Sequence, residues 1–181
     1  MNYSVVVEFK DADASGARKA VISRYNNGDA INSKPDVVVT AYSNTANGKY
    51  ETVTGFDDVE GDGDIDDDDA SYYALAADLA SAVVGLSAVG EGRRYRCILL
   101  SFGSQISNSR LADVNIGLFN VSNQDLNQPD AAVTVRDYSN GLYKTVLGST
   151  DADSDGDIDL DDQFIFRKIA SSFASMRDFK I

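Results

Sequence analysis

Two segments of the chain, residues 58–69 and 151–162, place acidic side chains at a spacing that suits a metal ion. Each segment has an acidic residue at positions 1, 3, 5 and 12 and a glycine at position 6. Carboxylates at positions 1, 3, 5 and 12, with the backbone carbonyl at position 7, are the oxygen donors that wrap Ca²⁺ in such loops. We name the segments loop 1 and loop 2. The candidate ligands are Asp58, Glu60, Asp62, Asp64 and Asp69 in loop 1 and Asp151, Asp153, Asp155, Asp157 and Asp162 in loop 2.

Electrostatic repulsion favours a metal-bound state of both loops. Residues 57–69 hold nine acids and loop 2 holds seven, and neither stretch has a lysine or arginine. Two unit charges about 4 Å apart repel by about 4 kcal/mol at an effective dielectric near 20. Because hard oxygen donors favour calcium over zinc or copper, we predict two Ca²⁺ sites. A solvated acidic turn is the alternative, and the short aspartate at position 12 leaves Mg²⁺ or weaker Ca²⁺ affinity open.

Two further positions bear on the shape of each loop. Gly63 and Gly156, at position 6, permit a sharp bend at positive φ that a Cβ atom would resist. Ile65 and Ile158, at position 8, are expected to insert into the core and to tie each loop to the fold.

The pattern Asp-x-Asp/Asn-Gly-Asp-Gly-x-Ile/Val-Asp-x-x-Asp, leading straight into a helix, resembles the calcium loop of type I dockerins. That family uses the loop and the exiting helix without the entering helix of an ordinary EF-hand. The resemblance covers residues 58–80 and 151–173 and implies calcium binding. Dockerins keep their two segments close together in a three-helix unit, whereas about 70 residues separate them here. Positions 10 and 11, which carry recognition side chains in cohesin-binding dockerins, are Asp67-Asp68 and Leu160-Asp161.

The two loops occupy equivalent places in an internal repeat. They agree at eight of twelve positions, 93 residues apart. Pro35 and Pro129, each followed by aspartate, match at a spacing of 94. Four upstream residues recur as well: Tyr50, Thr52, Val53 and Gly55 match Tyr143, Thr145, Val146 and Gly148. We therefore predict a tandem duplication with repeats at 1–88 and 92–181, joined by the glycine-rich stretch 85–92.

Each repeat is expected to be rich in strands. Short apolar runs and alternating apolar residues predict the strands 5–7, 20–25, 37–41 and 50–54, then 97–100, 114–118, 133–135 and 143–147. Residues 20–25 could also form a helix, but the alternation in their counterpart 114–118 favours a strand. Asn140-Gly141 predicts a hairpin turn, because both residues tolerate positive φ.

After each loop the apolar spacing becomes helical. The apolar residues that would share one helix face are Tyr72, Ala76, Leu79, Val83 and Leu86, then Ile165, Ile169, Phe173 and Met176. We expect these faces to be core. The predicted fold class is α+β, with two β-rich units that each end in a strand, a calcium loop and a helix.

Composition argues against most catalytic chemistry. The chain has no histidine, and its single cysteine, Cys97, can form neither an intrachain disulfide nor a multi-cysteine zinc site. No phosphate loop or nucleophile elbow is present, and no spacing singles out a carboxylate pair for glycoside hydrolysis. Of the 29 acids, 16 lie in residues 57–69 and 151–162, so the rest of the chain has 13 acids and 16 bases. We expect no enzymatic activity and no nucleic-acid partner for the acidic loops.

The expected function is structural. Two metal cages without an open catalytic position would rigidify a building block whose partners are copies of itself or other structural subunits. The chain starts without a visible secretory leader and has no apolar run long enough to span a membrane. A virion component, such as a phage capsid or tail protein, or an exported filament or layer would meet abundant calcium; a cytoplasmic location stays open. The alternatives are a calcium-dependent adhesion or dockerin-like module, gripping a partner around 71–78 and 163–168, and a calcium sensor or buffer.

Overall fold

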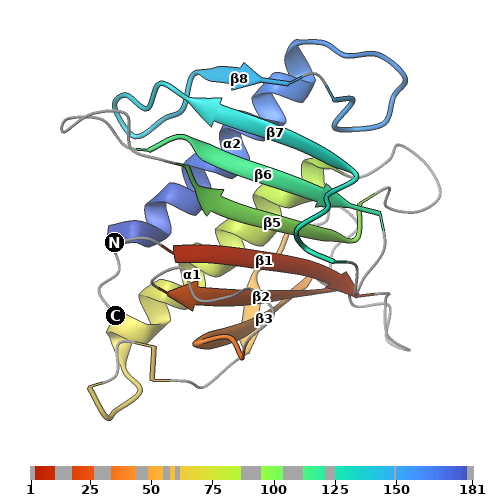
Figure 1. Cartoon of the computed structure of the whole chain (residues 1–181). Coiled ribbons are helices and arrows are strands. Elements are labelled where there is room, and N and C mark those ends of the chain that lie inside the picture. Colours follow the sequence, from red (N-terminus) through yellow and green to blue (C-terminus); the bar gives the residue numbers. More distant parts are fainter. Residues whose placement is uncertain are drawn as a thin grey trace.

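The strands and helices follow the same order in the two halves of the chain (Figure 1). The computed structural model describes residues 3–10, 18–26, 34–43, 49–54, 58–59, 62–86, 95–103, 112–120, 125–148 and 150–178. The first half contains β1 (Tyr3–Lys10), β2 (Arg18–Asn26), β3 (Val37–Ser43), β4 (Thr52–Thr54) and α1 (Asp67–Val83). The second half contains β5 (Cys97–Phe102), β6 (Val114–Phe119), β7 (Ala131–Arg136), β8 (Thr145–Leu147) and α2 (Leu160–Ser175). The short 3₁₀ turns η1 (Val84–Leu86) and η2 (Met176–Asp178) extend the helices. The α+β class is confirmed.

One antiparallel sheet contains all eight strands of the described residues, in the order β4-β3-β2-β1-β5-β6-β7-β8. The first strands of the two halves, β1 and β5, pair at its centre, where Val6 lies opposite Leu99. From this pair each half runs outward in chain order and ends in a strand of three residues, β4 or β8. The halves therefore share one sheet. Edge strands this short offer few free backbone groups to another chain.

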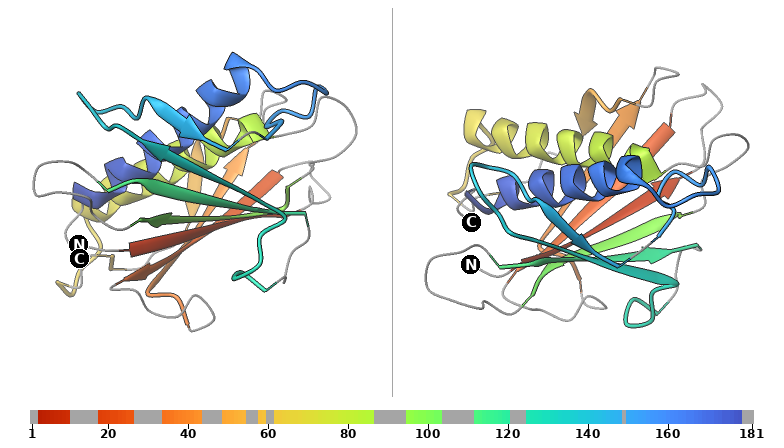
Figure 2. Two further views of the ribbon diagram at one scale, coloured as in Figure 1. Left: turned by 45° about the horizontal axis from the view of Figure 1, so that its top comes forward. Right: turned by 90° about the horizontal axis from the view of Figure 1, so that it is seen from above.

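Both helices cover the same face of the sheet and lie side by side on it (Figure 2). They run antiparallel, since the end of α1 meets the start of α2. A Cβ atom on Gly85 of η1 would lie 3.1 Å from Cγ1 of Ile165, and η2 in turn contacts α1. The predicted apolar faces are confirmed as core. The buried members are Tyr72, Ala76, Leu79, Val83, Leu86, Ile169, Phe173 and Met176, and the half-buried Ile165 packs against them.

A cluster of large side chains ties β1, β2 and β5 to the end of α2. The ring of Tyr3 lies 4.9 Å from that of Phe173 and 5.2 Å from that of Phe102, and the Tyr3 hydroxyl donates to the backbone carbonyl of Phe173 (2.5 Å). The buried guanidinium of Arg24 stacks 4.4 Å from the Tyr3 ring centre and donates to the carbonyl of Met176 (3.5 Å). Its Nε donates to Asn26 Oδ1 (2.9 Å), so hydrogen bonds and stacking on the aromatic face together stabilise the buried cation. The two halves therefore share a core as well as a sheet.

Two smaller predictions, the strand at 20–25 and the turn at Asn140-Gly141, are confirmed. Residues 20–25 lie within strand β2, and Asn140 and Gly141 turn the chain at φ 53° and 83° between the bridged residues Ser139 and Leu142. Cys97 is buried, and burial raises the pKa of its thiol to about 12, so the thiol stays neutral. Residues 87–92 of the predicted linker lie outside the described residues. Among the helices that the structure describes, none is long and apolar enough to cross a membrane.

The exposures along α2 predict a large difference between two identical substitutions. Phe173→Ala is expected to lower the free energy of unfolding by about 3–5 kcal/mol, because the ring is fully buried and its removal leaves a cavity. Phe164→Ala, two and a half turns earlier on the exposed side, should change the same quantity by no more than about 0.5 kcal/mol. Urea unfolding of both variants measures the difference, and equal losses would contradict the placement of α2.

Candidate metal centres

Each loop connects an edge strand to the first turn of a helix. Loop 1 follows β4 and leads into α1 at Asp67, and loop 2 follows β8 and leads into α2 at Leu160. Because the helices are antiparallel, the two loops lie at opposite ends of the helix pair (Figure 1). Nine of the ten candidate ligands lie in the described residues, and Glu60 lies outside them.

Loop 2 gathers its first three candidate ligands. One carboxylate oxygen from each of Asp151, Asp153 and Asp155 lies within 4.8 Å of the other two. The loop backbone curls around these groups. The N–H of Gly156 donates to Asp151 Oδ2 (3.2 Å), that of Asp155 to Asp153 Oδ1 (3.2 Å) and that of Asp157 to Asp155 Oδ1 (3.0 Å). Gly156 has φ 105°, so the bend predicted at position 6 is confirmed.

Loop 1 repeats this curl in its described part. The N–H of Gly63 donates to Asp58 Oδ2 (2.8 Å), and that of Asp62 to Asp58 Oδ1 (3.1 Å). The N–H of Asp64 donates to Asp62 Oδ1 (3.1 Å), and Gly63 has φ 101°. The carboxylates of Asp58 and Asp62 therefore turn inward, as their counterparts do in loop 2.

The carboxylates at position 12 are buried and close each loop on itself. Asp69 accepts hydrogen bonds from the N–H of Val59 (2.6 Å) and from the N–H of Asp66, the N-cap of α1 (2.9 Å). Asp162 makes the same pair of bonds in loop 2, at 2.5 and 2.7 Å. Each carboxylate thus joins the second residue of its loop to the first turn of its helix. Every such oxygen still has a lone pair that can face a metal ion.

Two N-cap aspartates complete this closure, and sequence analysis missed their role. The side chains of Asp66 and Asp159 accept from the N–H groups of Asp68 and Asp161, both at 2.7 Å. Together with the position-12 carboxylates they form a capping box at the start of each helix. The signal was available, since an aspartate followed three residues later by another acid, just before a helical apolar pattern, marks a helix start.

The predicted role of the position-8 isoleucines is wrong. Ile65 and Ile158 are 51% and 57% exposed. The apolar contact of each loop with the core comes instead from position 2, where Val59 and Ala152 are buried. Position 2 follows directly on the strand and is held by the position-12 carboxylate, whereas position 8 lies on the outer segment that leads to the N-cap.

Crowded negative charge and loss of hydration raise the pKa of three loop carboxylates. The negative charge of Asp62 raises the pKa of Asp64, and that of Asp155 raises the pKa of Asp157. Loss of hydration raises the pKa of Asp153, with smaller contributions from its acidic neighbours. These three groups bind a proton more readily than an ordinary aspartate, as expected where negative charge is crowded.

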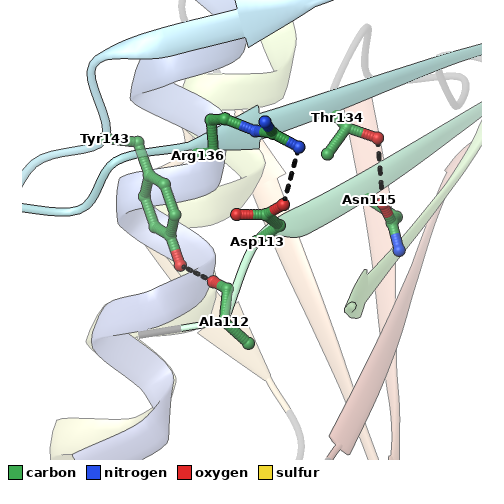
Figure 3. Close-up of polar contacts among 6 residues, drawn as sticks. All are labelled: Ala112, Asp113, Asn115, Thr134, Arg136 and Tyr143. Atoms are coloured by element: carbon green, nitrogen blue, oxygen red, sulfur yellow. Dashed lines mark hydrogen bonds and ion pairs between the residues drawn. The ribbon is translucent and has the colours of Figure 1, made fainter. Parts of the chain in front are cut away.

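Polar contacts join β7 and the hairpin before β8 to β6 and to the two residues that precede β6 (Figure 3). Arg136 pairs with Asp113 (3.2 Å), and the Thr134 hydroxyl donates to the side-chain oxygen of Asn115 (3.0 Å). The Tyr143 hydroxyl donates to the carbonyl of Ala112 (2.8 Å). Its pKa is raised to about 12 by burial, so Tyr143 stays neutral. Because these groups bond to one another across neighbouring strands, we assign them a structural role.

Comparisons with known proteins supply no family for this chain. No protein-family model, no curated protein and no solved structure matches it.

The raised pKa of Asp157 predicts a pH-dependent effect of Asp157→Asn in a chelating buffer. The native state holds the Asp157 proton more tightly than the unfolded state, whose pKa is near 3.8, so ionisation of Asp157 lowers the stability of the wild-type protein as pH rises above that value. Asparagine does not ionise. The variant should therefore gain stability relative to wild type as pH rises, and the gain should vanish at acid pH, where both side chains are neutral.

Melting temperatures of both proteins across the pH range measure this difference. Saturating calcium is the control, because a bound cation would offset the repulsion and shrink the gain. An Asp157→Asn effect of the same size at every pH would contradict a repulsive origin.

Proposed function

We propose that this chain is a non-enzymatic, calcium-binding structural protein with one Ca²⁺ in each loop. In loop 2, Asp151, Asp153, Asp155 and Asp162 would hold the ion through side chains and Asp157 through its carbonyl. In loop 1, Asp58, Glu60, Asp62 and Asp69 would do so, with the carbonyl of Asp64. All of these donors are oxygen atoms, which suits a hard cation such as calcium.

The single observation that carries the proposal is the convergence of three carboxylate oxygens within 4.8 Å in loop 2. Ionised carboxylates only accept hydrogen bonds, so they cannot stabilise one another. The backbone N–H groups of the loop offset part of their charge, but the pKa of Asp157 is still raised by Asp155. A divalent cation among them would supply the missing positive charge, which supports the metal over a solvated acidic turn.

Calcium bound in this way would act on the fold through the ends of its elements. Each ion would be held between the end of an edge strand and the first turn of a helix. Those are the parts of a sheet and a helix that open most easily. Two ions at opposite ends of the helix pair would therefore rigidify the whole layer.

The same proposal includes the tandem duplication of residues 1–88 and 92–181. The equal order of elements and the central pairing of β1 with β5 support it. A matched pair of bonds supports it further. The N–H of Asn26 donates to Asp36 and that of Asn120 to Asp130, both at 2.8 Å, and each aspartate follows one of the two prolines.

The proposed setting is an ordered assembly, with copies of this chain or other structural proteins as partners and no nucleic acid. A phage virion or an exported filament or layer would expose the loops to calcium at roughly 10⁻⁴–10⁻³ M, the range in which extracellular modules bind it. Rigid subunits suit such assemblies, because ordering on association then costs less.

A second candidate is a calcium-dependent adhesion or dockerin-like binding module. One observation favours it. Leu160 and Phe164, at the start of α2, are 71% and 62% exposed. Large exposed apolar residues in one place are typical of protein contact surfaces.

Calcium is expected to stabilise the protein. At about 100 times its dissociation constant, it should raise the free energy of unfolding by roughly 2.7 kcal/mol per site, because it binds the folded state preferentially. Asp58→Ala and Asp151→Ala each remove one site, so each should abolish about half of the total calcium-dependent gain if the sites are independent. Asp68→Ala and Asp161→Ala are the matched controls, since these exposed position-11 acids are not candidate ligands. Thermal melts with calcium and with chelator measure the effect, and unchanged melting would refute the metal sites.

Assembly is tested separately by electron microscopy of the purified protein with calcium and with chelator. The structural role predicts ordered polymers or layers in calcium that disappear on chelation. A protein that stays monomeric in calcium, yet shows the melting shift, would favour the binding module instead.

A further inference from the structure

The two helix starts differ in their surface although their loops are alike. Leu160 and Phe164 lie four residues apart on α2, so they share one face of the helix. The matching residues 93 positions earlier, Asp67 and Ser71, are polar and equally part of the exposed surface of α1. Only the second half has this apolar pair. Because loop 1 forms the same fold with polar residues at these positions, the loop fold does not require apolar residues there.

The core does not account for these side chains either. The buried face of α2 is formed by other residues, Phe166, Ile169 and Phe173. Leu160 and Phe164 point away from it, and they are the two most exposed of the large hydrophobic residues that the structure describes. Ile158 precedes them and is exposed as well. Exposed Leu147 adds apolar surface on β8, the strand that contacts α2.

The charge around this surface determines what can cover it. Asp157, Asp159 and Asp161 are exposed and interleave with Ile158 and Leu160 along the chain. The two bases of α2, Arg167 and Lys168, lie one turn after Phe164, so the end of the patch at Ile158 and Leu160 is bordered by acids. Loop 2 has seven acids, so one bound Ca²⁺ would still leave it at a net charge of −5. A second copy docking by the same patch would bring two such loops together and repel. A complementary partner has apolar side chains flanked by lysine or arginine.

We propose that Ile158, Leu160 and Phe164, with the acids of loop 2, form a docking surface for a cationic amphipathic segment of another protein. One segment binds per chain, at the second half only. This inference rests on the proposed function, because it names the chemistry of a protein partner for the calcium-stabilised unit. The apolar pair supplies the contact area, and the acids orient the partner and exclude anionic surfaces.

The test uses the full-length protein in calcium and a fluorescent synthetic peptide of leucine and lysine, designed as an amphipathic helix. Fluorescence anisotropy is expected to show one peptide per chain and no binding of a leucine–glutamate peptide. The double variant Leu160→Asp, Phe164→Ser installs the residues of the first half and should weaken binding at least about tenfold, as loss of an interface anchor does. This variant also adds a negative charge. If the cationic peptide bound through electrostatic attraction alone, the variant would therefore bind it more tightly than the wild type.

Two further variants sharpen the result. Ile65→Ser removes the exposed isoleucine of loop 1 and should leave binding unchanged. The double variant Asp67→Leu, Ser71→Phe transplants the apolar pair to α1, beside the acids of loop 1, and should raise the stoichiometry to two peptides per chain. Equal or tighter binding by the Leu160→Asp, Phe164→Ser variant would overturn the docking surface.

Melting curves with calcium and chelator on the same samples separate this inference from the proposed function. A calcium shift without peptide binding would defeat the docking surface and leave the metal sites standing. Peptide binding that depends on the apolar pair, without any calcium shift, would support the docking surface and defeat the metal sites. Light scattering tests self-association. If the wild-type protein forms dimers and the Leu160→Asp, Phe164→Ser variant does not, the patch binds a second copy of the chain, which would overturn the proposal of a cationic partner.

Discussion

Crowded negative charge at the start of two helices is the constraint on which the rest of the structure depends. The turn that leads into each helix connects an edge strand to that helix. It holds several carboxylates close together, and these repel one another. The fold solves part of this problem locally. Backbone N–H groups of the loop donate inward to the carboxylates, and a buried aspartate, Asp69 or Asp162, bonds to both ends of the turn. The positive end of each helix dipole lies beside these groups and favours them further.

Because each loop bonds to its own helix start, the helices hold the loops in place, and the shared sheet holds the helices. Pairing β1 with β5 removes the two strand edges that separate halves would expose at this position. The buried Arg24 then links strand β2 of the first half to the end of α2 in the second. Each loop is thus attached to a core that belongs to both halves.

The strands, the helices and the bend of each acidic loop at its glycine could be predicted from the sequence, because each leaves a local pattern. Short apolar runs and alternating apolar residues identified the strands, and the change to helical spacing identified both helices. The pairing of β1 with β5 could not be predicted, because alternation shows which side chains face inward but not which strand lies alongside. Arg24 was missed for a related reason. It occupies an inward position of β2, and the tyrosine ring that accommodates it, that of Tyr3, comes from another strand.

The prediction that Ile65 and Ile158 insert into the core is wrong because it depends on how distant parts of the chain pack together. An apolar residue at the outer side of a loop is buried only if another surface faces it. The two loops lie at opposite ends of the antiparallel helices, so neither can cover the other (Figure 1). Val59 and Ala152, next to the strand ends, are the residues that reach the core instead.

Some features occur in both halves of the chain, and others occur in only one. The inward-turned carboxylates, the capping boxes and the buried position-12 aspartates occur twice, so they serve the stability of each unit. Tyr50 and Tyr143 each donate their backbone N–H to a helix serine, Ser81 and Ser171, which again repeats. Leu160 and Phe164 occur once, on a surface where apolar side chains gain nothing in water. A feature that one half keeps and the other lacks, within the same local fold, is best explained by a contact that only that half makes.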